Sequence, residues 1–138
     1  MSLQEFLNNG DIFAHRAGAQ IIETSDGFAR AQMTVGQQHL NAGGVCQGGA
    51  MFTLADLALA AVMNGREQLT FSLESTISFL HHALPGDVLT AEAHELLNHH
   101  KIPYYQVQVK NQRDELVCVM TGLAYRTGKS LALDGQAD

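Results

Sequence analysis

An apolar stretch from Gly48 to Gly65, which reads GGAMFTLADLALAAVMNG, leaves this chain few possible folds. It is rich in the helix formers Ala, Leu and Met, and it closes on Asn64-Gly65, a common signal for the end of a helix. Its apolar residues lie nearly all the way round a helical projection, which predicts a helix that is buried on every side. Asp56 is its only charged residue.

The residues before this stretch predict a short helix and a hairpin. Ser2 and Glu5 have the spacing of a capping box, so a helix is expected over residues 3–9. Residues 17–24 and 27–35 are expected to form two strands joined at Ser25-Asp26-Gly27. Within the second strand, apolar and polar residues alternate with the period of two that a half-buried strand requires, and the inward set is Ala29, Ala31, Met33 and Val35.

Four further runs are typical of strands and follow without another helix, at about 69–81, 87–97, 103–111 and 115–127. The tail after Thr127 has no pattern and is expected to be disordered, which leaves an ordered core of about residues 3–127 in a single domain spanning 1–138. One apolar helix among about six antiparallel strands favours an α+β fold in which a curved sheet wraps the helix, the hotdog architecture. One such sheet covers the helix incompletely, so we expect edge strands to pair in an oligomer.

Charge and composition exclude several classes of protein. Fourteen acidic residues against eight basic ones give a formal charge of −6, which disfavours general binding to nucleic acid or to an anionic membrane. No window contains the ~18 consecutive apolar residues of a membrane span, and the N-terminus lacks the pattern of a signal peptide. The spacing of Cys46 and Cys118 suits neither zinc nor a redox motif, so two reduced thiols in a cytoplasmic protein are expected.

A longer motif surrounds the start of the predicted helix. It reads His39-x-Asn41-x-x-Gly44-x-x-Gln47-Gly48-Gly49-x-x-Phe52-x-Leu54-Ala55-Asp56. The motif resembles the signature of the PaaI-type (phenylacetyl-CoA thioesterase-like) branch of the hotdog thioesterases. A second match follows the helix, at Thr76-Ile77-Ser78-Phe79-Leu80 and Pro85-Gly86-Asp87, and the likeness extends over about residues 11–127.

This resemblance implies hydrolysis of an acyl-CoA substrate without a metal or an organic cofactor. It places an asparagine at Asn41 and a catalytic aspartate at Asp56, and it assigns the amides of Gly48 and Gly49 to substrate binding. Ser72 lies where some relatives have a serine that positions water. The family usually has a histidine before the two glycines, where this chain has Gln47. Glutamine can donate a hydrogen bond, but it cannot carry a proton or a charge.

The residues themselves suit this chemistry. Gly48 and Gly49 begin the helix, where backbone amides have no internal partner and the dipole favours negative charge, so they can form an oxyanion hole. A tight entry into the helix explains the glycines equally well. Burial would raise the pKa of Asp56 toward that of a useful general base, whereas a structural aspartate bonded to a neighbouring strand or subunit is the alternative. Direct attack and activation of water both fit this position.

The spacing of these groups predicts how the site is assembled. Gly48 and Asp56 are eight residues apart, which is ~12 Å along a helix axis. Both groups must lie within ~3–4 Å of the reacting carbonyl or its water. We therefore expect a composite site, with Gly48 from one subunit and Asp56 from its partner, and both a dimer and a dimer of dimers contain this pair.

Two other functions are compatible with the same fold. A hydratase or dehydratase would carry a His with an Asp or Glu in different motifs, which this chain lacks. A non-catalytic acyl-CoA-binding or regulatory protein is favoured by Gln47 and disfavoured by Asn41 and Asp56. The acyl group is not defined by the sequence, because small residues such as Ala50 and Ala58 could accommodate an aryl or medium-chain group or simply allow close packing.

Overall fold

A computed structural model describes residues 1–133 of the 138-residue chain. Two short helices open the chain, and a hairpin, a 3-10 turn and one long helix precede four more strands. The elements are α1 (Leu3–Gly10), α2 (Ile12–Arg16), β1 (Gln20–Ser25), β2 (Phe28–Thr34), η1 (Gln37–His39), α3 (Gly48–Met63), β3 (Gln68–Phe79), β4 (Val88–Leu97), β5 (Tyr104–Lys110) and β6 (Leu116–Ser130).

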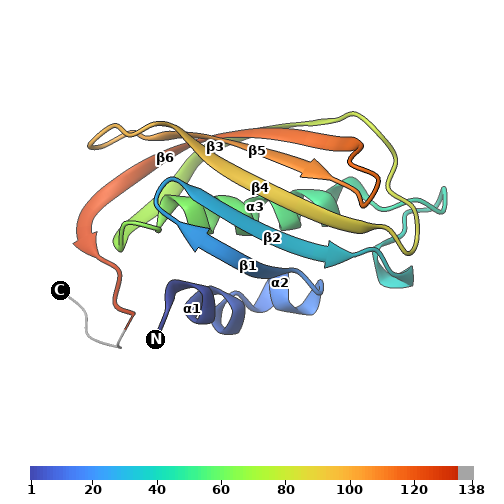
Figure 1. Cartoon of the computed structure of the whole chain (residues 1–138), viewed down its shortest axis with the longest axis horizontal. Helices are drawn as coiled ribbons and strands as arrows, with labels where there is room; N and C mark the ends of the chain where they lie inside the picture. Colours follow the sequence, from blue (N-terminus) through green and yellow to red (C-terminus); the bar gives the residue numbers. More distant parts are fainter. Residues whose placement is uncertain (134–138) are drawn as a thin grey trace.

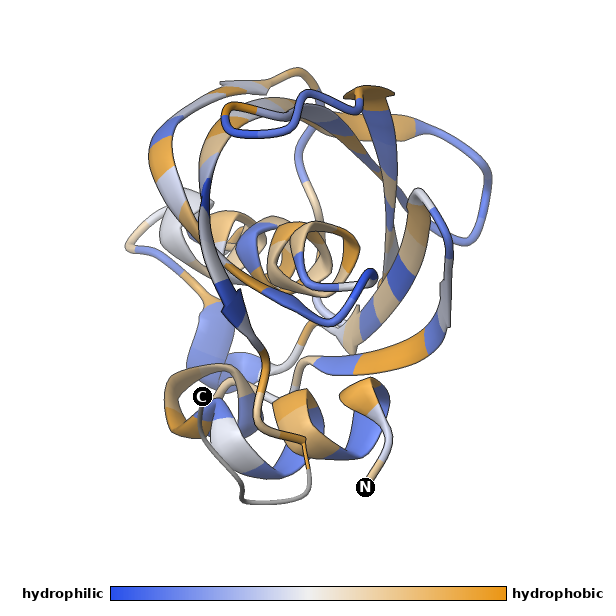
Figure 2. Ribbon diagram, turned by 90° about the vertical axis from the view of Figure 1, so that its left-hand side faces the viewer, coloured by the Kyte–Doolittle hydropathy of each residue, from blue (hydrophilic) through white to orange (hydrophobic). Residues whose placement is uncertain are grey.

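The strands form one six-stranded antiparallel sheet in the order β1-β2-β4-β5-β6-β3. The sheet curves over α3, and α1 and α2 lie next to β1, on the side of β1 away from β2 (Figure 1). Seen from the end, α3 occupies the centre of the curl, and hydrophobic and hydrophilic residues alternate along the strands (Figure 2). The α+β hotdog fold expected from the sequence is confirmed, and so is the burial of Ala29, Ala31 and Met33.

The N-terminal region holds one element, α2, that the sequence pattern does not predict. The capping box of α1 is present, because Ser2 Oγ accepts from Glu5 N at 3.1 Å and Glu5 Oε2 accepts from Ser2 N at 3.0 Å. Asp11 caps the C-terminus of α1 and also begins α2, since its Oδ1 accepts from Ala14 N at 3.0 Å. Five helical residues give too short a pattern to be recognised from periodicity.

The C-terminal strand is longer than predicted. β6 continues to Ser130, three residues past the expected end of the ordered core. Its last residues pair with the start of β3, where Gln68 lies opposite Ser130. Leu131 also lies within the described residues and donates from its amide to Glu67 O at 2.7 Å. The last part of the tail that was expected to be disordered, residues 134–138, lies outside the described residues.

The expectation that α3 is buried on every side is wrong for one face. Leu54, Leu57 and Leu59 are at most 1% exposed against the sheet. Residues at helical spacing on the opposite face remain exposed or half-exposed, and we call this face the open stripe; its members are Gly49, Phe52, Thr53, Asp56 and Ala60. The sheet encloses α3 on three sides, and the short helices α1 and α2 cover only part of the fourth (Figure 2).

One edge of the sheet is both unpaired and apolar. β3 pairs with β6 along one side and, within the described chain, with no strand along the other. Large apolar side chains on or next to it are about half exposed, namely Phe71, Leu73, Phe79 and Leu80. A long exposed edge with such side chains is a surface on which another strand can pair.

Candidate active site

The N-terminus of α3 presents two unused hydrogen-bond donors. Gln47 caps the helix with extended backbone angles (φ −64°, ψ 141°), and its carbonyl accepts from Ala50 N at 3.0 Å. Within residues 1–133, the amides of Gly48 and Gly49 donate to no protein acceptor. Both lie at the positive end of a 16-residue helix, so together they can stabilise an oxygen atom that becomes negative.

His39 fixes the chain that enters this helix. Its carbonyl accepts from Gln47 N at 2.7 Å, and its Nδ1 accepts from Gly36 N at 2.9 Å. Its Nε2 therefore carries the hydrogen, which it donates to the carbonyl oxygen of Ala17 at 2.6 Å. With both ring nitrogens engaged and only 5% of the residue exposed, His39 joins the end of α2 to the loop before α3.

Asn41 organises the same loop. Its Oδ1 accepts from Gly43 N at 2.9 Å and Val45 N at 3.3 Å, while its own backbone amide donates to Val45 O at 2.8 Å. These contacts are those of a side chain that closes a turn. Its Nδ2 donates no hydrogen bond within the part of the chain that the structure describes, so the group is available to a ligand.

Asp56 lies two turns further along the open stripe and borders a hollow of about 740 Å³. The carboxylate forms no hydrogen bond or ion pair with residues 1–133. Partial burial in the hollow raises the pKa of Asp56 above its ordinary value, and the negative charge of Asp11 raises it further. The hollow is lined by Asp11, Phe13, Gly49, Phe52, Thr53, Asp56 and Ser75.

Gln47 borders a second hollow of about 470 Å³, between α2 and the start of α3. Its side chain folds over the next turn, since a Cβ added to Gly49 would lie 2.6 Å from Gln47 Oε1. Arg16, Gln38 and His39 line the same hollow. Gln47 thus lies beside the free amides, at the motif position where the family usually has a histidine.

Two serines of β3 face α3 at different points. Ser72 donates to Met63 Sδ at 3.7 Å and lines a separate apolar hollow of about 410 Å³, while Ser75 lines the hollow of Asp56. Residues three apart would point to opposite faces of a regular strand. A register shift between Ser72 and Glu74 leaves Leu73 as the extra residue and turns both serines toward the helix. The sequence carries no signal for this bulge, so Ser75 could not have been selected from it.

The cysteines take no part in this arrangement. Both are free and buried, as expected of reduced thiols. Burial raises the pKa of Cys46, and burial together with the nearby Cys46 raises that of Cys118 to about 12. Both therefore stay protonated near neutral pH, which is unfavourable for a nucleophile. No cluster of His, Cys, Asp or Glu in residues 1–133 is placed to hold a metal ion, and no helix in that range is long and apolar enough to cross a membrane.

The chain belongs to the thioesterase superfamily, whose family model matches residues 43–118. This segment contains Gln47, the free amides at the start of α3, and Asp56. The match confirms the resemblance read from the motif.

Individual relatives narrow the comparison to the PaaI type. The chain is 34% identical over 121 residues to the acyl-coenzyme A thioesterase PaaI of Escherichia coli, covering 88% of this chain and 86% of that protein. The solved structure of E. coli PaaI, from the phenylacetic acid degradation operon, aligns with a TM-score of 0.86 at 32% identity, over 94% of this chain and 99% of that one. A Streptococcus mutans protein bound to acetyl-CoA aligns with a TM-score of 0.78 at 25% identity, over 81% and 90% of the chains.

Proposed function

We propose that this protein is an acyl-CoA thioesterase that hydrolyses its substrate to a free acid and CoA. The observation that carries the proposal is one unpartnered carboxylate, Asp56, on the same open stripe as the unpartnered amide of Gly49, along an otherwise apolar helix. Membership of the thioesterase superfamily and the acetyl-CoA bound to a relative support the same reaction.

In this proposal, the amides of Gly48 and Gly49 donate hydrogen bonds to the carbonyl oxygen of the thioester. They stabilise the negative charge that develops there when water attacks the carbonyl carbon. Asp56 takes the proton of the attacking water, for which its raised pKa makes it a stronger base. The carbon–sulfur bond then breaks, and CoA leaves as a thiol after it receives the proton. Direct attack by Asp56 on the carbonyl is the other route that the free carboxylate permits.

The site is proposed to form between two subunits. Gly49 and Asp56 border one hollow, but seven residues on a helix separate them by ~10 Å along its axis, which is too far for both to reach one carbonyl. The unpaired edge of β3 runs beside this hollow and supplies Ser75 to it. Pairing of two β3 edges would bring a second copy of α3 close, so that the amides of one subunit can meet Asp56 of the other. A dimer or a dimer of dimers satisfies this requirement.

Supporting roles are proposed for the remaining polar residues. The free Nδ2 of Asn41 can hold the substrate carbonyl or the attacking water, while its Oδ1 maintains the loop. Gln47 is proposed to orient the thioester as a neutral donor. Ser75, which shares the hollow of Asp56, is better placed than Ser72 to position water there. A cytoplasmic location stays a prediction that rests on the free thiols.

The proposal is tested by release of free thiol from a panel of short, medium, long and aryl acyl-CoAs, with Asp56→Asn measured alongside. We expect turnover by the native protein and a loss of at least 100-fold in Asp56→Asn, because removal of a general base costs about 10²–10⁴ in rate. Unchanged circular dichroism would show that the variant folds. Binding of acyl-CoA without turnover of any substrate would favour the non-catalytic alternative, for which Gln47 is the specific observation.

A further inference from the structure

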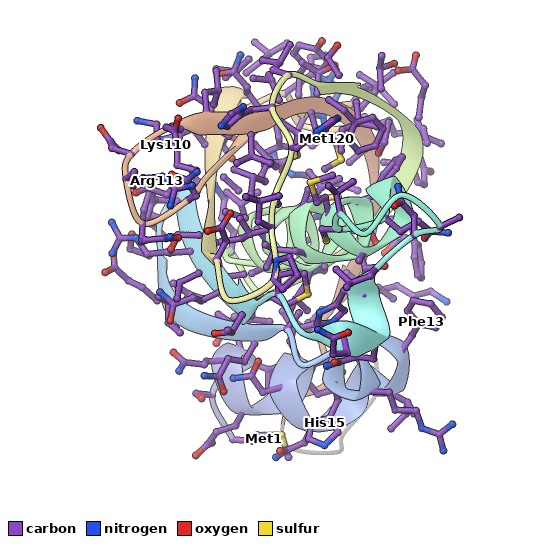
Figure 3. All side chains as sticks on the ribbon, turned by 90° about the vertical axis from the view of Figure 1, so that its right-hand side faces the viewer. Met1, Phe13, His15, Lys110, Arg113 and Met120 are labelled. Carbon is purple, nitrogen blue, oxygen red and sulfur yellow. The ribbon has the colours of Figure 1, made fainter. Side chains whose placement is uncertain are left out.

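Phe13 is an exposed aromatic residue at the edge of the candidate site. It lies on α2 with 74% of its surface exposed, although aromatic rings are usually among the more buried side chains. It projects outward from α2, beside the segment that leads into α3, whereas His15 points elsewhere from the same helix (Figure 3). In the described chain, the ring makes no aromatic or cation–π contact.

The helix that carries Phe13 is held at both ends. Asp11 caps its first turn through Ala14 N, and Ala14 itself is only 2% exposed in the core. At the other end, Ala17 O accepts the hydrogen bond from Nε2 of the buried His39. These contacts fix the backbone on either side of Phe13, so the point from which the ring projects is set before any ligand binds.

Phe13 lines both of the hollows that adjoin the N-terminal half of α3. The hollow of Asp56 and the hollow of Gln47 share only Phe13, Gly49 and Thr53. Gly49 has no side chain, and the hydroxyl of Thr53 is bonded back to Gly49 O at 2.8 Å. Of the three shared residues, Phe13 alone has a large side chain.

We propose that Phe13 is a specificity-determining residue that limits the acyl group accepted by this site. The inference rests on the proposed thioesterase function and adds the element that selects among substrates. Its ring packs against the acyl group beside Asp56 and closes that space from the hollow of Gln47. Without the ring, the two hollows become continuous, so a longer chain can pass from one into the other.

The test compares Phe13→Ala with the native protein on straight-chain acyl-CoAs of increasing length and on an aryl acyl-CoA. We expect kcat/KM to fall for short and aryl substrates, which lose contact with the ring, and to rise for long ones. The ratio of long-chain to short-chain kcat/KM should change at least tenfold, the size of effect that a change in an apolar pocket produces. Phe13→Trp, which enlarges the ring, should move the ratio in the opposite direction.

Ile12→Ala is the matched control. Ile12 is the neighbouring apolar residue, 57% exposed, and it lines neither hollow, so its removal should leave the chain-length profile unchanged. An equal loss for every substrate in Phe13→Ala, or the same shift in Ile12→Ala, would overturn the inference.

Binding separates this inference from the proposed function. Affinities for the same acyl-CoAs, measured by calorimetry with Phe13→Ala and native Phe13 both in an Asp56→Asn background that does not hydrolyse the ligand, should follow the same change in chain-length preference. A shift in binding preference without turnover in the native protein would retain Phe13 as the selective wall and reject hydrolysis. Turnover by the native protein with no shift of preference in Phe13→Ala would retain hydrolysis and reject Phe13 as the selective wall.

Discussion

Mixing two inactive variants should restore activity if the site is shared between subunits. One variant is Asp56→Asn, which lacks the proposed base. The other is Gly48→Pro, which lacks one proposed oxyanion donor. Gly48 is the first residue of α3, where proline is favoured, and Gln47 already has the extended backbone that a following proline requires. A Cβ at this position would lie 3.0 Å from Phe79 Cζ, and that ring is about half exposed, so it can shift.

The expected recovery follows from the geometry. Each variant alone should retain about 1% of native activity or less, since loss of an oxyanion donor costs about 10²–10³ and loss of a general base about 10²–10⁴. After random exchange at equal concentrations, about half of the dimers contain one subunit of each kind. In these dimers one site has both defects, and the other has both native groups. The mixture should therefore reach about a quarter of native activity.

The assay is thiol release after the mixed variants have been unfolded and refolded together, with subunit exchange verified by native mass spectrometry. Gly48→Ala is the matched control, because it adds the same Cβ beside Phe79 but keeps the amide, and it should remain active alone. If hybrids form and activity stays at the level of the separate variants, the shared site is refuted.

Three further predictions concern charge and packing. Asp11→Asn keeps the cap on α2 but removes the negative charge that raises the pKa of Asp56. The acid limb of the pH profile of kcat/KM should therefore move to lower pH, and an unchanged limb would exclude this coupling. Because the pKa of Asp56 is raised in the folded state, ionisation of this group destabilises the fold at neutral pH. The effect is absent below ~3.9, the pKa of an aspartate in the unfolded chain. In urea denaturation at pH 7, the free energy of unfolding of Asp56→Asn should therefore exceed that of the native protein, by less than about 1 kcal/mol because the group is so exposed. This difference should disappear as the pH falls toward 4. Gly122→Ala would place a Cβ 2.8 Å from Cδ2 of the buried Leu59, and it should lower the free energy of unfolding in urea by about 1–3 kcal/mol. The loss should be smaller when Leu59→Ala is also present, and equal losses in both backgrounds would contradict this contact.

Local patterns in the sequence were enough to predict most elements of the fold. The capping box at Ser2 and Glu5, the alternation in β2 and the apolar run of α3 depend on neighbours within a few residues, and all three are present. One long apolar helix among strands leaves few arrangements that enclose it, which is why the architecture followed from the order of elements. The motif around Asp56 likewise predicted the family.

Other features depended on contacts between distant parts of the chain. Val119 and Leu123 share one face of the last strand, β6, but the register places the other face, with Met120 and Ala124, against the core. Both faces of that strand are apolar, so its own pattern does not distinguish the inner side. The bulge in β3 similarly brought Ser75 beside Asp56.

The exposure of Asp56 depends on both local sequence and long-range contacts. The sequence determined that one carboxylate interrupts an apolar helix. Only the curl of the sheet decided that this carboxylate lies on the open stripe, near Asp11 and Phe13 of a helix more than 40 residues earlier in the chain. Helical periodicity records which residues share a face, whereas the burial of each face depends on which distant elements cover it.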